Sequence, residues 1–182
     1  MLAKTETTHF AYRPDLEGLR AIAVLLVIAA HAGVPFLRGG FVGVDVFFVL
    51  SGYLITALLT LEMQATGNVS FRKFYARRFR RLVPGLLFML LLVGLMASLT
   101  LSPTRRIEVA QTAMAAVLWV SNFYFAFSGQ DYFGPAAESN LFLHTWSLGV
   151  EEQFYLFWPL LLWLVFIGFR RFVSIMPTPP PP

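Results

Sequence analysis

The sequence predicts an all-α protein, a polytopic bundle of helices that cross a membrane, and two observations support this. Of the 182 residues, 57% are hydrophobic and only 13% are charged, whereas a soluble domain has about 25% charged residues. The hydrophobic residues also lie in long runs between charge clusters, which excludes a soluble fold and a disordered chain. The absence of cysteine excludes disulfides, thiolate metal sites and cysteine nucleophiles.

Five apolar runs are candidates for spanning helices, each near the roughly 20 residues that a crossing requires. In chain order they are Ala21–Leu37, Phe41–Leu61, Leu82–Pro103, Val109–Phe127 and Leu148–Phe169. The first run has a signal-peptide-like Ala-His-Ala sequence, but acidic residues precede it and further apolar runs follow, so cleavage is not expected. We expect a cytoplasmic segment at 1–15, a membrane domain at 16–171 and a proline-rich disordered tail at 172–182.

The basic segment between the second and third runs predicts the topology. Short loops rich in Lys and Arg stay on the cytoplasmic side, and this segment carries Arg72, Lys73, Arg77, Arg78, Arg80 and Arg81. An even number of runs separates it from the N-terminus, which is therefore cytoplasmic too. We expect a multi-pass protein of the inner or plasma membrane, whose positive charge reflects topology rather than nucleic-acid binding.

The run Val109–Phe127 leaves the number of crossings open at four or five. If it crosses, Arg170 and Arg171 lie outside, against the preference of basic residues for the cytoplasm. If it re-enters or lies on the outer surface, those arginines lie inside and loop 128–147, which has no Lys or Arg, lies outside. The polar residues of the run slightly favour the non-crossing alternative.

Ionisable residues within apolar runs are functional candidates, because a central charge costs about 2.5–3.5 kcal/mol in a membrane. Arg20 and His31 are eleven positions apart on one helix face, about 16.5 Å along the axis. Arg20 could hold an anionic donor, and the imidazole could move protons at neutral pH. Asp45 enters the second run at a similar depth and could fix the tautomer of His31. Alternatively, Arg20 is a topological anchor and His31 a hydrogen-bonding residue between helices.

Further candidates lie in three groups. Ser51 is a small residue suited to close helix packing. The arginine block suits phosphate binding through its guanidinium forks, with topology alone an equal alternative; it consists of Arg77, Arg78, Arg80 and Arg81. Polar residues at the mouth of the last run include two glutamates that also suit the positive end of a helix dipole; they are His144, Glu151 and Glu152.

Taken together, five blocks in order resemble the membrane-bound acyltransferase 3 family. They are Tyr12–Val24, His31, Gly40–Thr56, Arg77–Pro84 and Leu143–Pro159. The resemblance covers residues 12–169, and Glu17 stands where the family often has Asp. It implies a domain of about ten membrane helices, of which this chain would be the first half. It also implies transfer of an acyl group, expected to be acetyl, from cytoplasmic acyl-CoA to hydroxyls of a cell-surface polysaccharide or related glycan.

The resemblance also implies roles for the candidate residues. Arg20 and His31 match residues held to be essential, and the arginine block Arg77–Arg81 matches phosphate-facing arginines. We expect Arg20 and the block to bind acyl-CoA, without a metal. His31, Asp45 and Glu151 are expected to be catalytic, and Ser51, His144 and Glu152 to support them. His31 would act as a general base or carry the acyl group itself.

The number of apolar runs leaves other interpretations open. Four or five crossings instead of about ten suggest a truncated product, whose partners would be the lipid bilayer, the glycan acceptor and a missing C-terminal half or another subunit. One alternative is an inactive or split half-domain with a binding or assembly role. Another is a small transporter of the acyl donor or an anion, with His31 as a proton relay.

Overall fold

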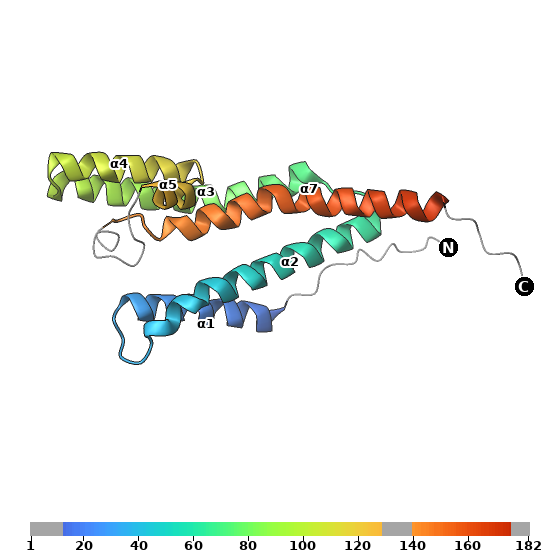
Figure 1. The fold of residues 1–182 in the computed structure, drawn as a ribbon, viewed down its shortest axis with the longest axis horizontal. Helices are drawn as coiled ribbons and strands as arrows, with labels where there is room; N and C mark the ends of the chain where they lie inside the picture. The colour runs from blue at the N-terminus through green and yellow to red at the C-terminus, as the bar shows by residue number, and fades with distance from the viewer. Residues whose placement is uncertain (1–12, 129–139, 176–182) are drawn as a thin grey trace, which may run out of the picture. The chain divides into compact units, whose positions relative to one another are not determined.

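The computed structural model describes residues 13–128 and 140–175, and the elements in these ranges are all helices (Figure 1). This confirms the all-α class. The chain divides into two compact units. The first holds Met1–Val69 and Trp158–Pro182, and the second holds Ser70–Phe157. The expected tail at 172–182 lies largely outside the described residues; within it, helix extends to Ile175.

The first unit begins with α1 (Pro14–His31), η1 (Arg38–Val42) and α2 (Gly43–Thr66). Proline is favoured in the first helical turn, because N–H groups at this position have no partner within the helix and proline has no N–H to leave unpaired. Arg13 pairs with Asp15 at 2.6 Å and lowers the pKa of that exposed carboxyl to about 2. The first apolar run therefore lies on a helix that begins before it, in the charged segment.

The same run does not stay helical as far as predicted. Gly33 has φ +68°, and the Val34 N–H bonds the Ala29 carbonyl at 3.0 Å. A left-handed glycine with this bond is a Schellman cap, which satisfies the last carbonyls of a helix and ends it. Helix α1 thus ends at His31 rather than at Leu37.

Two glycines let α1 and α2 pack backbone to backbone. A Cβ atom at Gly40 would lie 2.2 Å from the Leu26 carbonyl oxygen, and one at Gly43 would lie 2.2 Å from the Ala23 carbonyl oxygen. No larger residue fits either position unless the helices separate. This close approach fixes the α1–α2 hairpin, which carries Arg20, His31 and Asp45.

Helix α7 (Thr145–Ile175) begins in the second unit and continues into the first. In the first unit, the Trp158 indole donates to Thr56 Oγ1 and the Trp163 indole donates to Asn68 Oδ1, both at 2.8 Å. These bonds join the C-terminal part of α7 to α2 and to the turn that follows it.

The second unit contains α3 (Phe71–Thr100), α4 (Pro103–Val117), α5 (Ser121–Phe127) and the start of α7. Helix α4 folds back along α3 (Figure 1). The hydrophobic core of the second unit contains Leu86, Leu90, Ala97, Val109, Ala116 and Phe142. Buried Thr145, at the start of α7, is bonded to buried Ser121 of α5 at 2.9 Å.

The predicted run Val109–Phe127 is two short helices rather than one. Trp119 adopts φ +55°, and the Val120 N–H bonds the Ala115 carbonyl at 2.9 Å. This is again a Schellman cap, with tryptophan in the left-handed position that glycine usually takes. The sequence gives no warning of this break, because no glycine or proline marks it.

Among the described residues, three helices are long and apolar enough to cross a membrane: Arg38–Thr66, Phe71–Thr100 and Thr145–Arg171. They indicate a multi-pass membrane protein and correspond to the second, third and fifth predicted runs. By this criterion of length and composition, the part of the chain that the structure describes supplies three of the four or five expected crossings. Helix α1 has 18 residues that include Asp15, Glu17 and Arg20, and α4 has only 15 residues, about 22 Å against a core of about 30 Å.

Candidate functional site

His31 lies in the last turn of α1 and is exposed. Its Nδ1 atom is 2.8 Å from the Val27 carbonyl oxygen. A carbonyl oxygen only accepts, so Nδ1 carries the proton of the neutral ring and Nε2 is left with its lone pair. The backbone of α1 therefore prepares the imidazole to accept a proton at Nε2.

The sequence suggested that Asp45 fixes the tautomer of His31, but in the structure Nδ1 donates its hydrogen bond to a different residue. Asp45 lies exposed in the first turn of α2, and among the described residues no hydrogen bond joins it to His31. The Val27 carbonyl orients the ring instead, because it lies one helical turn before His31 on the same helix. Asp45 thus shares the hairpin with His31, and the described residues give no ion pair between the two.

Arg20 and Ser51 also lie on the α1–α2 hairpin. The Arg20 guanidinium sits 4.6 Å from the centre of the Phe47 ring on α2, an arrangement in which the cation is attracted by the ring face. Arg20 remains partly exposed, so its N–H groups stay available to an anion. Ser51 is buried within α2, 4% exposed, as expected for a residue at a close helix contact.

The arginine block lies in the N-terminal third of α3, and its four members are not equivalent. Arg77, Arg80 and Arg81 are exposed. They share one helix face, because residues three and four apart lie side by side on a helix. Arg78 points elsewhere and is only partly accessible, with 28% of its side chain exposed.

Arg78 is held by residues from the start of α7. Its Nη1 lies 3.5 Å from Glu152 Oε1, and its guanidinium carbon lies 3.1 Å from the centre of the Tyr155 ring. Glu152 is 7% exposed and Tyr155 is 1% exposed. One member of the expected phosphate-binding block is thus already paired inside the protein.

The other polar residues at the start of α7 divide between surface and interior. His144 is exposed just before the helix begins, while Glu151 is half-buried. The Tyr155 hydroxyl donates to Glu151 Oε1, and the Tyr75 hydroxyl of α3 donates to the Leu156 carbonyl at 2.8 Å. Glu151 therefore takes part in a tyrosine-linked network rather than standing free at a helix mouth.

A reciprocal amide pair was not expected from the sequence. Asn122 Nδ2 donates to Gln153 Oε1 at 3.0 Å, and Gln153 Nε2 is 2.9 Å from Asn122 Oδ1 and 2.8 Å from the Trp119 carbonyl. Gly149 makes room for this pair, since a Cβ atom there would lie 3.0 Å from Asn122 Oδ1. The pair ties α7 to the break between α4 and α5.

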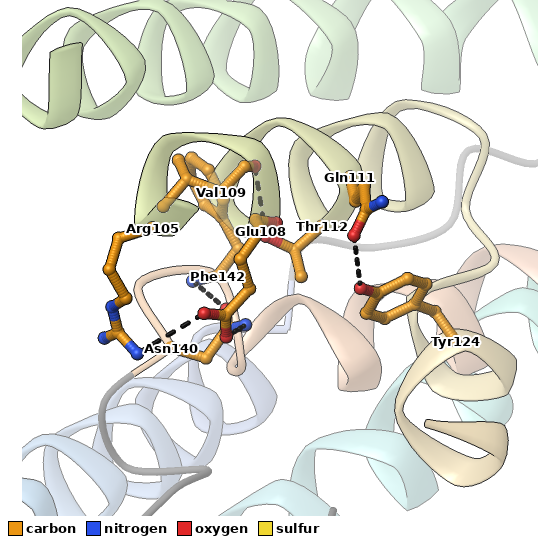
Figure 2. A network of polar contacts seen from close by, with 8 residues as sticks. All are labelled: Arg105, Glu108, Val109, Gln111, Thr112, Tyr124, Asn140 and Phe142. Carbon is orange, nitrogen blue, oxygen red and sulfur yellow. Dashed lines mark hydrogen bonds and ion pairs between the residues drawn. The ribbon is translucent and has the colours of Figure 1, made fainter. Parts of the chain in front are cut away.

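A second unexpected network surrounds Glu108 on α4 (Figure 2). Arg105 approaches Glu108 Oε2 at 3.3 Å, and Asn140 donates to Oε1 at 3.2 Å. Asn140, 7% exposed, accepts the Phe142 N–H at 3.0 Å. The network anchors the segment before α7. No short-range sequence pattern predicts the bond between Glu108 and Asn140, because these two residues lie 32 positions apart. Within 13–128 and 140–175, no group of three or more His, Asp or Glu side chains is placed to hold a metal ion.

Comparison with known proteins gives a family match over most of the chain. The family model described as an acyltransferase domain, acyltransferase 3, matches residues 13–176. This confirms the resemblance that the five sequence blocks indicated. No solved structure matches the chain.

Relatives from Staphylococcus aureus are named as O-acetyltransferases. The chain is 43% identical over 159 residues to O-acetyltransferase OatA of strain NCTC 8325 / PS 47, covering 87% of this chain and 26% of that protein. It is 41% identical over 167 residues to a provisionally named O-acetyltransferase of strain MSSA476, covering 92% of this chain and 27% of that protein. The chain thus spans about a quarter of the length of these relatives.

Proposed function

Because the chain belongs to the acyltransferase 3 family, we propose that it is part of a membrane-bound O-acyltransferase. The donor is cytoplasmic acyl-CoA, with acetyl as the acyl group, and the acceptors are hydroxyls of a cell-surface polysaccharide or related glycan. The identity of 41–43% with O-acetyltransferases carries this proposal. The match covers about a quarter of those proteins, so the activity is that of a whole protein to which these residues contribute.

In this proposal the exposed arginines of α3 bind donor phosphates, and Arg20 of α1 is a further phosphate-binding candidate. Coenzyme A carries phosphate groups, and the guanidinium fork binds phosphate through paired charge-assisted hydrogen bonds. Arg77, Arg80 and Arg81 are exposed on one helix face, which supports the assignment.

His31 is the proposed general base. Its Nε2 accepts the proton of the acceptor hydroxyl while the hydroxyl oxygen bonds to the thioester carbonyl carbon. The carbon–sulfur bond then breaks, and the thiolate leaves and takes up a proton as coenzyme A. The lone pair at Nε2, which the Val27 hydrogen bond leaves free, supports this role. Asp45, on the same hairpin, and Glu151 remain further catalytic candidates.

For the topology, we propose that α1 lies in the membrane with α2 and that the N-terminus and the arginine block are cytoplasmic. Between Arg20 and His31 the exposed side chains of α1 are apolar, with Ile22 55%, Leu25 63% and Ile28 57% exposed, and a water-facing helix would not present them. Single cysteines at position 77 should resist an impermeant thiol reagent in intact cells, and cysteines at position 139 should react. Ready labelling at 77 contradicts the orientation, and protection at 139 restores the crossing of Val109–Phe127.

The activity is tested with membranes from cells that produce the protein from its complete coding region. Radiolabelled acetyl-CoA is supplied, and alkali-labile label on the glycan and free coenzyme A are both measured. Equal amounts of ester and free coenzyme A support the enzyme. Movement of label into sealed vesicles without thioester cleavage indicates a transporter. If neither of these two results is obtained, a half-domain with a binding or assembly role is indicated.

A further inference from the structure

One arginine of the α3 block has the environment of a structural ion pair rather than of a ligand-binding residue. Arg78 pairs with Glu152 and stacks on Tyr155, whereas among the described residues Arg77, Arg80 and Arg81 have no side-chain hydrogen bond or ion pair. The four residues lie within five positions of one helix and have the same chemistry. Their different surroundings therefore come from the packing of α7.

Burial of Glu152 determines what loss of the pair would do. Glu152 is only 7% exposed, and a buried carboxylate is tolerated only when a partner compensates its lost hydration. The carbon of the partner guanidinium lies over the Tyr155 ring, 3.1 Å from its centre, a contact that lysine does not reproduce. Removal of Arg78 alone would leave an uncompensated charge at the contact of α3 and α7.

One further bond links the same stretches of these helices. The Tyr75 hydroxyl, one turn before Arg78, donates to the Leu156 carbonyl at 2.8 Å. The contacts repeat from turn to turn, so they define the register of α3 against α7.

We propose that Arg78 is a positioning residue, which locks α3 in register with α7 through Glu152 and Tyr155 and does not bind the donor. This inference rests on the proposed function and divides the block into one locking arginine and three donor-binding ones. The exposed arginines hold phosphates from one face of α3 whatever the register. A change of register displaces that face of α3, and the donor bound to it, along α7.

The test compares Arg78→Gln with the matched variant Arg80→Gln, each alone and combined with Glu152→Gln. Kinetic constants for acetyl-CoA are measured per folded molecule, after size-exclusion chromatography of the full-length protein. Arg78→Gln should lower kcat by about 10²-fold, the effect of a misplaced reacting group, and leave KM nearly unchanged. Arg80→Gln should raise KM about tenfold, as expected for the loss of one charge-assisted hydrogen bond.

The double variants decide between the lock and donor binding. Glu152→Gln should restore much of the kcat lost in Arg78→Gln, because it removes the unpaired charge, and should restore nothing in Arg80→Gln. If Arg78→Gln raises KM as Arg80→Gln does, and Glu152→Gln gives no rescue, the lock is refuted. If Arg78→Gln does not fold, recovery of folded protein in its double variant supports the lock, and equal loss refutes it.

A failure of the proposed function gives a different result. In that case the wild-type protein transfers no acetyl group, and the lock is judged by thermal unfolding in detergent micelles. A double variant that is more stable than the sum of the single effects supports the lock. Strictly additive effects overturn it.

Discussion

The α1–α2 hairpin and the region where α3 meets the start of α7 hold their polar residues in opposite ways. In the hairpin the helices approach through glycine, and the ionisable side chains of His31 and Asp45 remain exposed. Where α3 meets α7, partly exposed Arg78 pairs with buried Glu152. The hairpin gains its close packing from backbone contacts, and the other region gains specificity from paired charges.

An ionisable residue in a membrane helix is therefore not by itself evidence of a catalytic or binding role. A group that already has a buried partner is committed to the fold, because separating the pair leaves a desolvated charge. A group bonded only to its own helix, such as His31 through Val27, remains available to a substrate. The predictions below test this distinction, from the largest expected effect to the smallest.

Removal of the His31 imidazole should abolish acyl transfer without unfolding the hairpin. A general base contributes about 10²–10⁴ in rate, while a hydrogen bond between membrane helices averages only about 0.6 kcal/mol. The variant His31→Ala should therefore lose transfer from labelled acetyl-CoA while its midpoint of unfolding in detergent stays nearly unchanged. Activity above about a tenth of wild type, which is more than loss of a base allows, would reassign His31 to packing and direct attention to His144 and Glu151.

A methyl group at Gly43 should separate α1 from α2. The added Cβ would lie 2.2 Å from the Ala23 carbonyl oxygen, so Gly43→Ala should lower the free energy of unfolding by about 1–3 kcal/mol, as overpacking does. Gly85→Ala in α3 is the control, since a Cβ there meets nothing within 4 Å. It should stabilise by roughly 0.5–1 kcal/mol. Equal effects of the two changes in detergent unfolding would refute the backbone contact.

The guanidinium of Arg20 should govern the affinity for the donor. Arg20→Lys keeps the charge but loses the fork, and we expect the KM for acetyl-CoA to rise about tenfold with a smaller fall in kcat. Phe47→Leu removes the ring beneath the guanidinium and should raise KM about two- to fivefold, the equivalent of an exposed cation–π contact. A KM unchanged by Arg20→Lys would return Arg20 to the role of a topological anchor.

Loss of the Tyr155 hydroxyl should have the smallest effect of the four. Tyr155→Phe removes the hydrogen bond to Glu151 but keeps the ring against Arg78. The expected loss is about 1 kcal/mol of unfolding free energy, typical of one hydrogen bond. Tyr124→Phe, which removes a more exposed bond to Gln111, should cost less. A larger loss for Tyr124→Phe would show that burial does not decide the value of these bonds.

The amino-acid sequence alone predicted the fold class and the family, and the three long helices are among the five apolar runs that it marked as candidates. These depend on properties of single segments, namely hydrophobic length and the order of local motifs. The end of α1 could also have been predicted from the sequence, since glycine often caps helices and Gly33 does so here. The sequence did not reveal the break at Trp119, because a left-handed tryptophan carries no compositional mark and costs of order 1–3 kcal/mol that only its surroundings can offset.

Which arginine of the α3 block pairs with Glu152 depends on the tertiary structure. Arg77 and Arg78 are neighbours in sequence with identical side chains, so no local pattern can separate them. Glu152 lies 74 positions beyond Arg78, and the fold alone brings the two together. The same holds for Glu108 and Asn140, which meet across 32 positions. Hydrophobicity acts segment by segment and can be read along the chain, whereas the partner of a buried charge is set by the packing of one helix against another.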